Sequence, residues 1–114
     1  MILSNDAKNA LLQGLASALN VGDNAKLSIY IDAVAVVDFI MPNPIQQSIA
    51  DGVLTFNLPE KVLATESGTP TSAKLFASDG TEFAEFAIGS DITLSRNEFY
   101  MGGYVSLTSL AINI

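Results

Sequence analysis

The N-terminal part of the chain carries its large apolar residues at helical spacing. They recur one to four positions apart and form one apolar stripe: Leu11, Leu12, Leu15 and Leu19. Ser4 precedes this run as an N-cap and Gly22 follows it as the expected stop, which predicts one amphipathic helix over about residues 5–20. Gly14 lies inside the run and costs about 1 kcal/mol relative to alanine, so we expect close packing there or a frayed helix.

Beyond Gly22 the apolar period changes from helical to two. Residues 26–31 alternate apolar and polar positions, which is typical of a half-buried strand. Residues 34–41 are apolar on both faces apart from Asp38, which favours a central strand or one covered by the helix. Five further strands are predicted: 53–58, 72–77, 82–88, 91–95 and 104–114. Residues 60–70 are expected to be coil, although 61–64 also fit a short turn of helix or strand.

Two local features define how the later strands are connected. Residues 78–81 contain Asp79-Gly80, a strong hairpin signal, because glycine adopts positive φ without penalty. Within 104–114 the apolar residues change from odd to even positions after Leu107. A β-bulge near Thr108-Ser109 would bring both sets to the same face of the strand.

This succession predicts a mainly β fold with one N-terminal amphipathic helix. About seven short strands joined by turns, without helical crossovers, favour an antiparallel β-sandwich or jelly-roll-like arrangement. The 114 residues are expected to form a single domain, 1–114, with the β-sandwich over about 26–114. A hydrophobic content of 49% is enough for a core and argues against disorder.

The charge of the chain makes some partners improbable. Five basic against 12 acidic residues give a net charge of −7, and the basic residues are scattered. Nucleic acid and anionic membrane surfaces both require concentrated positive charge, so we expect neither as a partner. The chain lacks a basic segment followed by a long apolar run at its start, and we expect it to be made in the cytosol.

Few residue types remain for catalysis or metal binding. The chain has no histidine and no cysteine, which excludes His-dependent triads, thiolate sites and the usual zinc sites. Ser72 and Lys74 share a strand face, but such a pair is ordinary on a solvated strand. Asp23, Asp51 and Asp79 each stand beside Gly or Asn, which indicates turns rather than calcium ligands.

Glu82 and Glu85 resemble a glycosidase carboxylate pair in composition only. Three positions apart on one strand they lie on opposite faces unless a bulge intervenes, which removes the facing geometry that such a pair needs. We therefore predict no catalytic residue, no cofactor and no metal, and a protein that is not an enzyme.

A contact surface is the one functional feature that the residues themselves indicate. Residues 99–104, "FYMGGY", place large apolar groups beside a glycine pair in an expected loop. The candidate contact residues are in this loop and on the helix: Phe99, Tyr100, Met101, Tyr104, Leu11 and Leu15. An alternative stays open, in which Phe99 and Met101 pack into the end of the sandwich.

Short motifs along nearly the whole chain resemble one known group of proteins. In order they are the helix "SNDAKNALL" (4–12), "KLSIY" (26–30), a Pro-bearing turn, "DGVL" (51–54), "SDG" (78–80), "DITL" (91–94) and "GYVSLTSLAI" (103–112). This succession resembles a group of small tailed-bacteriophage virion proteins. The chain departs from the group at Thr71-Ser-Ala73, where an aromatic residue is common, and over 32–40, which is more apolar.

The resemblance implies a structural role in the virion and supplies no catalytic residues. The expected function is capsid decoration or cementing, with the major capsid protein or other virion proteins as partners and a homo-oligomer, such as a trimer, as the assembly. The expected location is the virion, after synthesis in the host cytoplasm. The alternative is a tail or neck module that binds a host surface glycan through Tyr30, Tyr100 or Tyr104.

Overall fold

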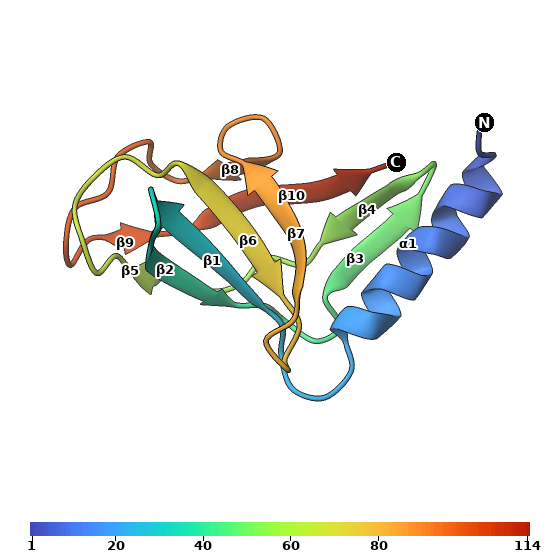
Figure 1. Ribbon diagram of the computed structural model, residues 1–114, viewed down its shortest axis with the longest axis horizontal. Coiled ribbons are helices and arrows are strands. Elements are labelled where there is room, and N and C mark those ends of the chain that lie inside the picture. The colour runs from blue at the N-terminus through green and yellow to red at the C-terminus, as the bar shows by residue number, and fades with distance from the viewer.

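The computed structural model describes residues 1–114 and contains one helix and ten strands (Figure 1). Helix α1 spans Asn5–Leu19. The strands are β1 (Lys26–Ile31), β2 (Val34–Ile40), β3 (Gln46–Ala50), β4 (Val53–Phe56), β5 (Val62–Leu63), β6 (Ser72–Phe76), β7 (Glu82–Ala87), β8 (Ile92–Leu94), β9 (Tyr104–Val105) and β10 (Leu107–Asn113). All seven predicted segments contain strands, the last of them divided into β9 and β10. Strands β3 and β5 are additional.

A side chain caps the start of the helix, and a backbone N–H closes its last turn. The Ser4 hydroxyl accepts the Ala7 N–H at 3.2 Å, which confirms the predicted N-cap. The last helical residue is Leu19 and the C-cap is Asn20, two residues before the predicted stop at Gly22. The prediction of close packing or fraying at Gly14 is wrong, because the helix is continuous and a Cβ at this position meets only open space.

One side of the helix is buried, and it is rotated slightly from the predicted stripe. Leu12, Ala16 and Leu19 are buried, whereas Leu11 is 57% exposed. The buried side lies against β3 and β4 (Figure 1).

Two four-stranded sheets form the body of the molecule, and every pairing between named strands is antiparallel. The first sheet has the order β2-β1-β6-β7, and the second has the order β3-β4-β10-β8. Strands β5 and β9 form a separate two-stranded pair at the end of the molecule far from α1 (Figure 1). The fold is therefore mainly β, with antiparallel sheets and one N-terminal helix, as predicted.

Strand β2 occupies a different place from the one its sequence suggested. It is an edge strand that pairs only with β1, so the prediction of a central or helix-covered strand is wrong. A bulge between β1 and β2 turns two successive side chains inward, and Val36 and Val37 are both buried. Thr65 N–H donates to the Val36 carbonyl at 3.0 Å, so the segment after β5 covers this edge.

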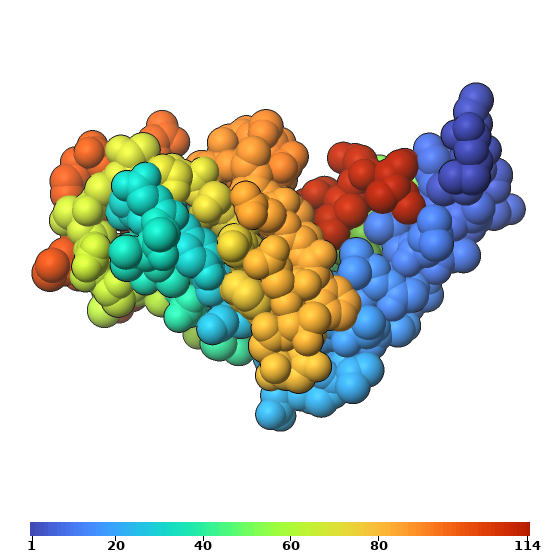
Figure 2. Space-filling model, viewed as in Figure 1, coloured from blue at the N-terminus to red at the C-terminus, as the bar shows by residue number.

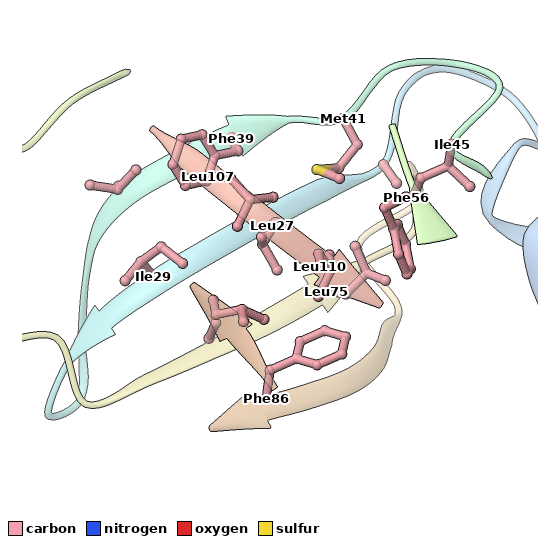
Figure 3. Close-up of a cluster of buried hydrophobic side chains, with 14 of the residues drawn as sticks. Leu27, Ile29, Phe39, Met41, Ile45, Phe56, Leu75, Phe86, Leu107 and Leu110 are labelled. Atoms are coloured by element: carbon pink, nitrogen blue, oxygen red, sulfur yellow. The ribbon is translucent and has the colours of Figure 1, made fainter. Parts of the chain in front are cut away.

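The two sheets and the helix share one hydrophobic core of 22 buried residues. Figure 3 shows Leu107 and Leu110 of the second sheet among Leu27, Phe39 and Leu75 of the first. Leu107 and Leu110 are three positions apart but both buried, because the register of β10 against β8 shifts between Leu107 and Ser109. The predicted bulge in the last strand is confirmed.

Candidate contact surface

The loop at residues 99–104 is joined to the β5–β9 end by backbone hydrogen bonds. Phe99 and Gly68 exchange two bonds of 2.8 and 3.0 Å. Ala64 N–H donates to the Gly103 carbonyl and its own carbonyl accepts from Gly102 N–H, both at 2.9 Å. Gly102 has φ 80°, a left-handed conformation that favours glycine. The loop is therefore anchored on both sides.

The anchored loop exposes most of its large side chains. Tyr100 is 57%, Met101 70% and Tyr104 54% exposed. Leu63, directly opposite Tyr104 in the β5–β9 pair, adds a side chain that is 46% exposed. We call these four residues the loop patch: Leu63, Tyr100, Met101 and Tyr104. Phe99 is fully buried, so its assignment as a contact residue is corrected: its side chain fills the core beneath the loop.

Two basic side chains flank the loop patch. Lys61 Nζ lies 4.4 Å from the Tyr104 ring centre, and the Arg96 guanidinium carbon lies 5.8 Å from that of Tyr100. A cation over an aromatic face is attracted by the negative face of the ring. The patch therefore combines apolar area with two of the five basic residues of an acidic chain.

The helix residues among the candidates do not join this patch. Leu11 is exposed on the outer side of α1, and Leu15 is half-buried against the core. The helix and the β5–β9 pair lie at opposite ends of the long axis of the molecule (Figure 1). The structure thus separates the six candidates into the loop patch, the buried Phe99 and an isolated pair on the helix.

Of the three tyrosines considered for glycan binding, two share the loop and one does not. Tyr30 is half-buried in β1, and Lys74 Nζ lies 5.6 Å from its ring centre. Each of the three rings therefore carries a cation over one face. Sugar rings stack on open aromatic faces, so part of the stacking surface is already occupied.

The acidic residues of β7 are arranged differently from the prediction. Register pairs Glu85 with Lys74 and Glu82 with Phe76, and Lys74 and Phe76 share a face of β6. Glu82 and Glu85 therefore lie on one face, because a bulge at Phe83 adds an extra residue between them. The prediction of opposite faces is wrong. Lys74 Nζ lies 3.4 Å from Glu82 Oε1, so one carboxylate of the two is in an ion pair.

The hairpin at Asp79 has the predicted turn chemistry. Thr81 N–H donates to Asp79 Oδ1 at 2.9 Å, and Gly80 has φ 90°. The Thr81 hydrogen bonds, first that of its backbone and then that of its side chain, lower the pKa of Asp79 below its ordinary value. Nowhere in the structure do three or more His, Cys, Asp or Glu side chains gather as metal ligands.

Comparisons of the chain with protein-family models, with curated proteins and with solved structures give no match. With 15 residues, α1 falls short of the length and hydropathy that a bilayer crossing by a helix requires, and there is no other helix.

Sequence reasoning did not identify Leu63 as part of the patch. Strand β5 has only two residues, too few for a period-two pattern, and its partner β9 lies about 40 positions later. Only the pairing of Leu63 with Tyr104 brings the two side chains to one surface.

Proposed function

We propose that the chain is a non-enzymatic structural protein of a tailed-bacteriophage virion, and that it decorates or cements the capsid. The ordered motif resemblance supports the virion role. The observation that carries the contact itself is the loop patch, four large exposed side chains of which three lie on a hydrogen-bonded loop and the fourth, Leu63, on the neighbouring strand β5. Exposed apolar clusters of this kind are typical of protein–protein contacts.

In this proposal the loop patch packs against the major capsid protein. Tyrosine and methionine supply contact area, and the anchored backbone reduces the entropy lost when the patch binds. The two sheets form a β-sandwich, an arrangement supported by their shared core. Copies assemble as a homo-oligomer such as a trimer. Several weak contacts then add to one stable attachment.

The test is binding of the purified protein to capsids produced without it. Met101→Glu places a charge on the most exposed side chain of the patch and is expected to weaken binding about tenfold or more, because a few contact residues dominate such interfaces. Val21→Glu is the matched control, since Val21 is 68% exposed and Met101 70%, and Val21 lies outside the patch. Binding is measured by co-sedimentation with the capsids.

Both variants should fold, because both side chains are exposed in the isolated protomer. Circular dichroism and thermal unfolding verify this. Equal binding of Met101→Glu and wild-type protein contradicts a contact through the loop patch. No binding of wild-type protein to any capsid contradicts decoration.

A second candidate function is glycan recognition by a tail or neck module. The observation that favours it is the exposure of Tyr100 and Tyr104 on one loop. A glycan array separates the two candidates: binding lost in Tyr100→Ala and Tyr104→Ala supports glycan recognition, and an array without signal counts against it.

A further inference from the structure

A groove separates the first sheet from the end of β10, away from the loop patch. Its volume is about 490 Å³, and its walls come from β7, the turn before β8, and β10. Figure 2 shows the surface hollowed between the orange atoms of β7 and the red atoms near the C-terminal end. Each wall includes a small side chain, Ala84 on one and Ala111 on the other.

On the β7 wall the backbone has an unpaired edge. Strand β7 pairs with β6 on one side only. Ala87 donates its N–H to Asp91 Oδ2 at 2.8 Å, and its carbonyl accepts the Asp91 N–H at 3.1 Å, so both groups of Ala87 point to the outer edge. Backbone direction repeats every two residues, and Glu85 therefore also directs its N–H and carbonyl outward, where no strand pairs with them.

On the β10 wall the last residues are likewise paired on one side only. Ile114 N–H donates to the Gly52 carbonyl at 3.2 Å, which directs its backbone toward β4. Because the backbone direction alternates from one residue to the next, Ala111 and Asn113 direct their N–H and carbonyl groups away from β4 and toward the groove. Strand β8 ends its pairing opposite Leu110, the next residue Asp91 stands opposite Ala111 in the same register, and Asn113 has no residue paired with it on this side.

The charged groups of the groove are both acidic. Glu85 and Asp91 line it, and no basic residue does. Lys74 stands opposite Glu85 across the β6–β7 pair, but the only salt bridge of the structure joins Lys74 to Glu82. Charge complementarity therefore favours a basic occupant.

A second copy of this chain does not fit that requirement. Its nearest two basic residues in sequence, Lys61 and Lys74, are 74 − 61 = 13 positions apart, so no short segment carries two of them. Four of the five basic side chains also lie over aromatic rings of the same chain. Both features disfavour a second copy of this chain as the occupant.

We propose that this groove binds an extended, basic segment of another protein as an added β-strand. The segment hydrogen-bonds to the free backbone groups of Glu85 on one wall and of Asn113 on the other, beside Ala111. Side chains of paired strands that stand opposite one another share a face, so a Lys or Arg opposite Glu85 lies beside its carboxylate. Small apolar residues alternate with the basic ones and face Phe86 and Ile112. This proposal does not depend on the capsid contact, which lies in other elements.

The test uses a capped hexapeptide of alternating valine and lysine as the probe. Two-dimensional NMR of the ¹⁵N-labelled protein should show saturable shifts of the Glu85, Ala111 and Asn113 amide signals. Glu85→Gln should weaken binding about two- to fivefold, the range for an exposed charge pair. Glu60→Gln is the matched control, because it removes the same charge from an exposed residue outside the groove, and it should bind like wild type.

Two further peptides separate strand addition from non-specific attraction. A version methylated on alternate backbone nitrogens loses the donors that pair with a strand edge, and a valine–glutamate version reverses the charge. Both should fail to shift the three amide signals. Equal shifts with either peptide overturn the proposal, as does an absence of shifts at these amides with the valine–lysine peptide.

Discussion

At the scale of single residues, the Asp79 carboxylate acts as an acceptor within its own turn. Its pKa is lowered in the folded chain, so the ionised form favours folding. That contribution is present above the unfolded-state pKa and is lost as the pH falls through the folded-state pKa.

Titration of the Asp79 carboxyl carbon by NMR should give a midpoint below the ordinary value of 3.8. In Asp79→Asn the amide oxygen can still accept the Thr81 bond but carries no charge. Its stability deficit relative to wild type should therefore shrink as the pH falls below the ordinary carboxyl range. A midpoint at or above 3.8 contradicts the assignment.

A second prediction concerns the stability effect of replacing Gly14. The position is helical and a Cβ there meets no neighbour, so Gly14→Ala should raise the free energy of unfolding by about 1 kcal/mol. Gly22→Ala is the contrasting variant: φ is 78° and a Cβ there lies 2.8 Å from Ser78 Oγ, so we expect a loss of about 1 kcal/mol or more. Urea unfolding measures both, and the same sign for both changes would contradict the structure.

The contact residues show what a residue pattern can and cannot reveal. The segment at 99–104 was predicted to be a contact surface because it combines aromatic residues with glycines, and Tyr100, Met101 and Tyr104 are exposed. Phe99 is buried because it pairs with Gly68, about 30 positions earlier, and that pairing orients its side chain inward. Nothing local in the sequence distinguishes Phe99 from Tyr100 in this respect.

At the scale of elements, Asn20 joins the helix to β3. Its Oδ1 accepts the Ile45 N–H at 2.8 Å, and its Nδ2 donates to Gln46 Oε1 at 2.8 Å. Asn20→Ala leaves a part-buried N–H without a partner and should lower the free energy of unfolding by about 1–3 kcal/mol. Gln46→Ala removes only the second bond and should cost less. Chemical unfolding of both variants checks the order, and a larger loss in Gln46→Ala would contradict this role.

The elements predicted from sequence are those with a strong period of their own. Strands β1 and β6 alternate apolar and polar residues, and the hairpin between β6 and β7 carries an Asp-Gly signal. Strand β3 was missed because "QQSIA" has one large apolar residue, and it forms because β4 and α1 lie beside it. The bulge at Phe83 was missed for a different reason: it depends on the register with β6, which the sequence of β7 alone does not specify.

At the scale of the whole molecule, the possible contact surfaces are kept apart. The loop patch is at the end away from the helix, and the acidic groove lies between β7 and β10 (Figures 1 and 2). An attachment through the loop patch therefore leaves the groove open for a second partner. The sequence indicated the loop, but the groove depends on two strand edges from different sheets and has no sequence signal.

Quantitative mass spectrometry of purified phage particles tests the proposal of capsid decoration most directly. Decoration predicts that the protein is present in many copies, in a fixed ratio to the major capsid protein, because the shell repeats its attachment site. Absence from the particles, or only a few copies per particle, would contradict a capsid decoration protein.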